Sequence, residues 1–186
     1  GAVVVAGHAA AINFSGLLFI PYLALSSIAT TLCGEACGSG SLTRTRTVVR
    51  LCFLVNFTQY LLLVTLLLLG RHQFAAWYSR DPEVIALTAS LLLFNALYLL
   101  PDSFQYLCMG LMRGFRATAT ILCISLIAYW LLGLPLGTAL ARGWFTTPLA
   151  AYGVWTGLTV ALSAACILYL LALRRELQRL SKAIPR

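Results

Sequence analysis

One carboxylate in the sequence could do ion or proton chemistry. Asp102 is the only acidic residue with long apolar runs on both sides, because the others fall at segment ends or in connections: Glu35, Asp81, Glu83 and Glu176. A carboxylate at the depth of a bilayer costs at least ~2.5–3.5 kcal/mol, so one that persists there usually serves an ion or substrate pathway. The position of Asp102 therefore indicates binding of a small monovalent cation or a proton. A structural hydrogen bond between helices is the alternative.

The residues around Asp102 favour the first interpretation. At 100° per residue, four polar side chains fall within about 60° of Asp102 and form one polar stripe on an oily helix: Asn95, Tyr98, Gln105 and Tyr106. Tyr98 lies one turn before the acid and is the candidate second ion ligand. Asn95, Gln105 and Tyr106 are candidates to line a cavity, as is Asn13 in an earlier apolar segment. For Asn13 and Asn95, a hydrogen bond between helices is an equally good interpretation.

Pro101 predicts a hinge beside this acid. Proline has no N–H, so the carbonyl of Leu97 loses its helical partner one turn before Asp102. A kink at Leu97 and Pro101 would free that carbonyl oxygen to support a cation. Prolines are also ordinary in membrane helices, where a kink need not have a function.

The composition shows which elements must position these residues. Hydrophobic residues make up 61% of the chain and charged residues 10%, and the mean hydropathy is +0.91. Soluble domains carry roughly 45–50% apolar and about 25% charged residues, so the composition predicts a membrane protein. The net charge of +8 does not indicate nucleic acid, because no soluble basic patch with interleaved aromatic residues accompanies it. No catalytic triad, phosphate loop or metal-ligand cluster is recognisable, which argues against an enzyme and predicts no cofactor other than a coupling ion.

Five segments are long enough to cross a bilayer, which takes about 20 helical residues. We expect an all-α, polytopic bundle forming one transmembrane domain over residues 1–186, with spans at about 6–33, 51–69, 84–111, 118–140 and 149–173. The polar stretch Gly38–Arg44 is expected to be a flexible link. Asp81 is expected to cap the third helix, with Pro82 at its first position.

The basic residues predict the topology. With alternating spans, ten fall on one side (Arg44, Arg46, Arg50, Arg113, Arg116, Arg174, Arg175, Arg179, Lys182 and Arg186) and three on the other (Arg71, Arg80 and Arg142). The positive-inside rule then predicts a cytoplasmic C-terminus in the inner (plasma) membrane. An odd number of spans and a first residue other than Met suggest the C-terminal part of a longer transporter.

Glycines spaced four apart predict close helix packing. The pairs are Gly34/Gly38, Gly110/Gly114, Gly133/Gly137 and Gly153/Gly157. Small residues at this spacing let membrane helices approach where no hydrophobic effect drives them together. We expect a tight bundle.

The order of several motifs makes the chain similar to a known family. These motifs are Gly7-His8, Ile12-Asn13-Phe14-Ser15, Gly34-Glu35-Ala36-Cys37-Gly38, Asp81-Pro82-Glu83-Val84, Tyr98 with Asp102 and Gln105, Gly110-Leu111-Met112-Arg113-Gly114, Tyr129-Trp130-Leu131-Leu132-Gly133-Leu134-Pro135-Leu136-Gly137 and Ala151-Tyr152-Gly153-Val154-Trp155-Thr156-Gly157-Leu158. Together they resemble helices eight to twelve of a MATE (multidrug and toxic compound extrusion) transporter of the NorM-like branch. The chain departs from the family pattern at Ala9, Leu32 and Ala117, which bears on gating contacts and substrate range.

The resemblance implies a cation-coupled antiporter made of two six-helix lobes, with most of the C-terminal lobe present here. It implies that Asp102 and Tyr98 bind the coupling ion, either Na⁺ or H⁺, and that the expelled substrates are cationic or amphipathic drugs. The lipid bilayer and an N-terminal lobe of the same transporter would be its partners, and the only metal ion would be Na⁺ at Asp102.

Two other functions remain open at this stage. One is a lipid-linked-saccharide flippase of the same wider superfamily, which would call for a cationic cavity, whereas the charge at mid-membrane is negative. The other is a membrane fragment or scaffold that does not transport.

Overall fold

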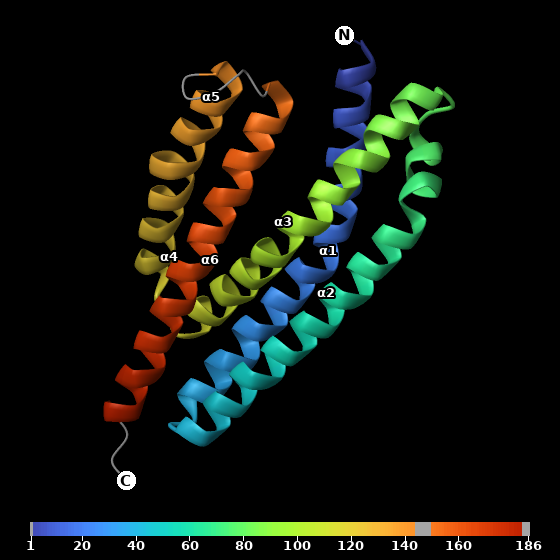
Figure 1. Cartoon of the computed structure of the whole chain (residues 1–186). Helices are drawn as coiled ribbons and strands as arrows, with labels where there is room; N and C mark the ends of the chain where they lie inside the picture. The colour runs from blue at the N-terminus through green and yellow to red at the C-terminus, as the bar shows by residue number, and fades with distance from the viewer. Residues whose placement is uncertain (1, 144–149, 184–186) are drawn as a thin grey trace.

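Five long helical rods make up the computed structural model of the chain (Figure 1). The structure describes the backbone of residues 2–143 and 150–183, and the side chains of residues 3–143 and 156–183. The helices are α1 (Ala2–Gly38), α2 (Leu42–Tyr78), α3 (Pro82–Gly114), α4 (Thr118–Ser125), the π-helix η1 (Leu126–Gly133), α5 (Leu134–Arg142) and α6 (Ala150–Ala183). Because α4, η1 and α5 follow one another without a break, they form the fourth rod. Within the described backbone there is no strand, as the all-α prediction requires.

All five rods are long and apolar enough to cross a membrane, which confirms the predicted number of spans. Each rod extends beyond its predicted span at one or both ends. Hydropathy detects only the apolar part of a helix that would lie in the hydrocarbon core of a membrane. The link Gly38–Arg44 is shorter than expected, because α2 already begins at Leu42. The Ser41 hydroxyl caps that start by accepting a hydrogen bond from the Arg44 N–H at 3.2 Å. Leu149, the predicted start of the last span, lies outside the described residues.

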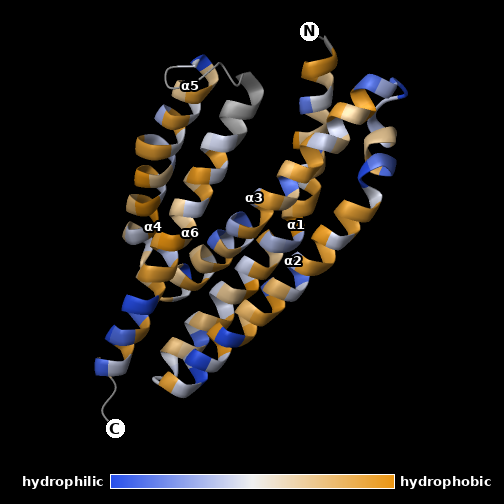
Figure 2. Ribbon diagram, in the orientation of Figure 1, coloured by the Kyte–Doolittle hydropathy of each residue, from blue (hydrophilic) through white to orange (hydrophobic). Residues whose placement is uncertain are grey.

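Consecutive rods run in alternating directions, so the described connections lie at the two ends of the bundle (Figure 1). The α1–α2 turn, the α3–α4 turn and the C-terminal end of α6 lie at one end. Hydrophilic residues, drawn blue, lie there at the start of α2 and the end of α6, and also at the opposite end around the α2–α3 turn, while apolar residues, drawn orange, predominate in the middle of the rods (Figure 2). Nine of the ten basic residues predicted on one side of the membrane therefore lie at one end of the bundle, and the tenth, Arg186, lies outside the described residues.

Helix α3 is the central element of the bundle. It packs against α1, α2 and α6, and it crosses between the α1–α2 pair and the rods formed by α4–η1–α5 and α6 (Figure 1). The largest apolar cluster joins α1, α3 and α6 near their C-terminal ends and includes Cys33, Leu111 and Tyr169. A second cluster joins α1, α2 and α3 around Tyr22 and Leu99. Both clusters hold α3 in place, and with it the polar stripe.

Two of the predicted glycine pairs lie at close helix contacts. A Cβ atom built at Gly110 would lie 2.2 Å from the Ser26 carbonyl oxygen, and one at Gly114 would lie 2.7 Å from the Cys33 Cβ atom. These glycines thus allow α3 to touch α1. The pair Gly133/Gly137 meets α6 in the same way, at Gly157 and Ala161.

The other two pairs differ. Gly34 lies at the contact of α1 with α3, because a Cβ atom built at Gly114 would lie 3.0 Å from the Gly34 backbone nitrogen, whereas a Cβ atom at Gly38 would meet nothing within 4 Å. Gly153 lies among the residues whose side-chain surroundings are not described. Spacing alone does not say which helix face carries the partner.

The fourth rod departs from a regular α-helix in its middle. Over Leu126–Gly133 the hydrogen bonds shift by one residue, and the Leu134 N–H bonds to the Tyr129 carbonyl five positions earlier. The shift ends just before Pro135, which cannot donate the next helical hydrogen bond. π-Helical turns are rare and are frequent at functional sites. This one places Tyr129 toward α3.

Candidate functional site

Local sequence signals set where α3 begins and ends. The Asp81 carboxylate accepts a hydrogen bond from the Glu83 N–H at 2.9 Å, and Pro82 occupies the first turn, as predicted. At the other end, the N–H of Ala117 bonds to the Met112 carbonyl at 3.0 Å. The helix is continuous through Pro101 between these two ends.

The polar stripe on α3 points into the bundle. Asn95, Tyr98 and Gln105 are buried, whereas Asp102 and Tyr106 are half-buried. Tyr98 packs against Leu162 of α6, with Tyr129 beside them. The 100° geometry therefore placed these residues on one inward face, and the structure adds the contacts from α1, η1 and α6.

No counterion of Asp102 is found among the described residues. Among the residues that the structure describes, none donates a hydrogen bond to its carboxylate or forms an ion pair with it. Four tyrosines lie close enough to feel its charge: Tyr22 of α1, Tyr98 and Tyr106 of α3, and Tyr129 of η1. A carboxylate that has tyrosines of three helices nearby and no basic partner among the described residues can offer oxygen atoms to a cation or take up a proton.

The two amides of the stripe add further acceptors. Asn95 donates its Nδ2 hydrogen to the Ser15 hydroxyl of α1, and Gln105 donates its Nε2 hydrogen to the Tyr129 hydroxyl of η1. In both residues the remaining oxygen, Oδ1 of Asn95 and Oε1 of Gln105, is buried without a hydrogen-bond partner. Buried acceptors without a partner are uncommon and call for an explanation such as a bound water or ion.

The remaining sequence candidates lie elsewhere. Asn13 is exposed on α1 and is not among the residues around Asp102. Leu97 and Pro101 line an apolar groove of about 620 Å³ that also involves Phe57 of α2 and Ile167 of α6. The proposed hinge thus adjoins a different surface from the polar stripe, and its motion stays a prediction.

Two residues around Asp102 were missed by sequence reasoning. Tyr22 lies in α1, and its buried hydroxyl has no hydrogen-bond partner. Tyr129 lies in η1 and was noted only as part of a motif. Each lies in a long apolar run of another helix, so the periodicity of α3 gives no sign of it. Only the packing of α1 and η1 against α3 brings these tyrosines near Asp102.

Comparisons with known proteins agree with this arrangement of helices. The family model described as MatE matches residues 1–139. The multidrug resistance protein PmpM of Pseudomonas aeruginosa is 39% identical over 178 residues, which cover 95% of this chain and 37% of that protein. The crystal structure of the eukaryotic MATE transporter AtDTX14 superposes with a TM-score of 0.84 at 19% identity, covering 98% of this chain and 41% of that one. A crystal structure of a MATE in the bent conformation also gives 0.84, at 20% identity, covering 96% and 38%.

The chain thus spans less than half the length of each of these relatives. The solved structures show that the fold is shared. The match to the family model and the 39% identity to PmpM show that the chain is related to these proteins in sequence. The chain belongs to the MATE family of transporters.

Proposed function

We propose that the chain forms part of an antiporter that expels cationic or amphipathic organic compounds in exchange for Na⁺ or H⁺. The observation that carries this proposal is the carboxylate of Asp102, which lies within a helix long and apolar enough to cross a membrane, has four tyrosines nearby and has no counterion among the described residues. A lone acid in such a segment is by default a candidate for an ion pathway. The name of the Pseudomonas aeruginosa relative, a multidrug resistance protein, supports the substrate class.

In the proposed mechanism, Asp102 binds the ion in its ionised state and Tyr98 supplies a supporting oxygen. The basic end of the bundle would face the cytoplasm, as the positive-inside rule predicts. The ion can favour one conformation only by binding it more tightly than the other, and the drug must have the opposite preference. Because Tyr129 and Tyr22 belong to other helices, a charge change at Asp102 would be felt across the contacts of α3 with η1 and α1.

The test replaces Asp102 with Asn in the protein expressed at full length. Asp102→Asn keeps the size of the side chain and removes its charge, so we expect loss of ion-driven drug export with normal membrane insertion. Drug resistance of cells and uptake into proteoliposomes under a Na⁺ or H⁺ gradient are the measurements. Asp81→Asn is the matched control, because Asp81 lies at the start of α3 and its amide replacement can still accept a cap hydrogen bond. Full export by Asp102→Asn would refute the assignment.

A further inference from the structure

A second polar site lies at the basic end of the bundle, away from Asp102. A cavity of about 620 Å³ opens where the C-terminal ends of α1, α3 and α6 meet. Gly34, Gly38 and Gly114 leave room for it, and Phe115 and Leu180 give it apolar walls. Its charged lining residues are Arg116, Glu176 and Arg179. The cavity therefore combines an apolar wall with charges of both signs.

The charges are arranged at different depths. The side chain of Glu176 is only 16% exposed, whereas that of Arg179, which binds it at 2.8 Å, is 75% exposed. Arg116 is exposed and makes no ion pair within the described residues. The carboxylate thus lies inside the cavity and the guanidinium groups lie at its rim. A simple anion would be repelled by Glu176, and a simple cation would be repelled by the two arginines.

The backbone at Arg116 supports a role for this side chain. Its φ of 60° is the only positive φ of a residue other than glycine in the described chain. This position follows the end of α3, where the N–H of Arg116 bonds to the Arg113 carbonyl at 2.9 Å and glycine is the usual residue. Non-glycine residues in this conformation are uncommon, and such strain clusters at ligand sites.

The apolar spans predicted from the sequence put the cavity at the level of a bilayer's headgroup layer. Arg116 lies five residues beyond Leu111, where the third apolar span ends, and Glu176 lies three residues beyond Leu173, where the fifth ends. At ~1.5 Å per residue these offsets are about 4–8 Å. Each headgroup layer is about 5–8 Å thick, the difference between a hydrocarbon core of ~30 Å and a full bilayer of ~40–45 Å.

We propose that this cavity binds the headgroup of a phospholipid that carries both a phosphate and a primary ammonium. The phosphate would be held by the fork of N–H donors of Arg116, and the ammonium would donate to the carboxylate of Glu176. Glu176 has acceptor sites to spare beside its pair with Arg179. The site is independent of ion binding at Asp102, so the proposal does not rest on the transport function.

Competition among lipids tests the proposal. The full-length protein is mixed with phosphatidylethanolamine, phosphatidylglycerol and phosphatidylcholine that carry identical acyl chains. The amount of each lipid retained is measured in nanodiscs or by native mass spectrometry. We expect phosphatidylethanolamine to be retained best, since phosphatidylglycerol lacks the ammonium and the quaternary ammonium of phosphatidylcholine has no N–H to donate. The preference should be about five-fold, as for one hydrogen bond to a partly solvated charge.

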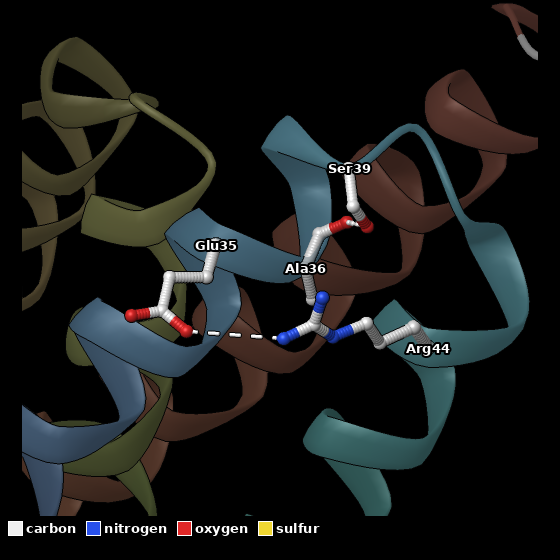
Figure 3. A network of polar contacts seen from close by, with 4 residues as sticks. All are labelled: Glu35, Ala36, Ser39 and Arg44. Carbon is white, nitrogen blue, oxygen red and sulfur yellow. Dashed lines mark hydrogen bonds and ion pairs between the residues drawn. The ribbon is translucent and has the colours of Figure 1, made fainter.

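Variants separate the two charges. Glu176→Gln should abolish the preference for phosphatidylethanolamine over phosphatidylglycerol, and Arg116→Asn should weaken retention of all three lipids. Asparagine tolerates a positive φ, so Arg116→Asn keeps the backbone conformation at this position. If Arg116 served only to form this turn, Arg116→Asn would retain lipid and thermal stability like the wild type, which would contradict the proposal. Glu35→Gln and Arg44→Gln are the matched controls. These two residues form a pair at 3.9 Å at the same end of the molecule but do not line the cavity (Figure 3).

Two further outcomes would overturn the proposal. The first is a lipid preference of Glu176→Gln equal to that of the wild type. The second is displacement of the bound lipid by millimolar inorganic phosphate, which would make the cavity a site for free anions.

Discussion

Replacement of Gly110 by alanine tests the packing that positions the polar stripe. A Cβ atom at this position would lie 2.2 Å from the backbone carbonyl oxygen of Ser26 and 2.6 Å from its hydroxyl oxygen. The hydroxyl can rotate away, but the carbonyl belongs to the backbone of α1. Real Cβ atoms essentially never have a neighbour closer than 3.0 Å and ordinarily lie 3.4–4 Å from it, so α1 and α3 must separate locally by about 1 Å.

That separation would break the hydrogen bonds along this contact. The Ser26 hydroxyl donates to the Tyr106 carbonyl at 2.6 Å, and the Thr30 hydroxyl donates to the Gly110 carbonyl at 3.0 Å. An additional 1 Å takes both beyond hydrogen-bond distance. Hydrogen bonds between membrane helices contribute ~0.6 kcal/mol on average and up to ~1.7, and overpacking costs ~1–3 kcal/mol. Together these predict that Gly110→Ala lowers the free energy of unfolding by about 2–4 kcal/mol.

The assay is the thermal stability of the full-length protein in detergent, followed by the fraction that remains monodisperse after heating. Gly16→Ala and Gly34→Ala are the controls, because their Cβ atoms would meet nothing or a single atom at 3.9 Å. Alanine favours a helix over glycine by ~0.5–1 kcal/mol, so both controls should be neutral or stabilising. If Gly110→Ala is as stable as Gly16→Ala, α1 and α3 do not approach each other closely at Gly110.

Two further predictions concern the contacts of α6. Gly157→Ala should destabilise the protein to a similar degree, because a Cβ atom at Gly157 would lie 2.4 Å from the Gly137 Cα atom. The same heating assay measures this loss of stability, with Gly16→Ala as the control that should show none. Tyr169→Phe should cost about 1–2 kcal/mol, because the buried Tyr169 hydroxyl bonds with the Ser125 hydroxyl at 2.9 Å and donates to a backbone carbonyl of α4 at 3.0 Å; an unchanged melting temperature would contradict it.

Much of the fold could be predicted from hydropathy, because a span of about 20 apolar residues has few other uses. The start of α3 was predictable as well, since Asp81 and Pro82 act within one helical turn. The start of α2 was missed because Leu42 and the arginines after it lie outside the hydrocarbon core, where a helix leaves no hydropathy signal. The π-helical geometry of η1 was also missed, because α- and π-turns suit the same apolar residues. The one sequence feature that indicated an irregular helix there was Pro135, which cannot donate a helical hydrogen bond.

The candidate site was predictable in part. Helical periodicity placed Tyr98, Gln105 and Asp102 on one face, because that relation depends only on one helix. It could not supply Tyr22 or Tyr129, since these come from other helices and their approach depends on how the rods pack. For the same reason the sequence could not show that, of the pair Gly34/Gly38, only Gly34 meets another helix.

The balance of donors and acceptors around Asp102 links stability to the proposed ion binding. The amide nitrogens of Asn95 and Gln105 are used to join α3 to its neighbours, and their buried oxygens lack donors. Each unsatisfied acceptor costs about 1–3 kcal/mol, and a carboxylate without a counterion adds to this excess. A bound cation or proton would compensate this excess of acceptor oxygens and negative charge. An amide in place of Asp102 removes the charge and adds donors, so it would compensate part of the excess whether or not the ion is bound. On the proposed function, Asp102→Asn should therefore melt at or above the wild-type temperature without the coupling ion, while losing the stabilisation that the ion gives the wild type. If the variant melts lower and still responds to the ion, Asp102 serves to pack the bundle and the ion binds elsewhere.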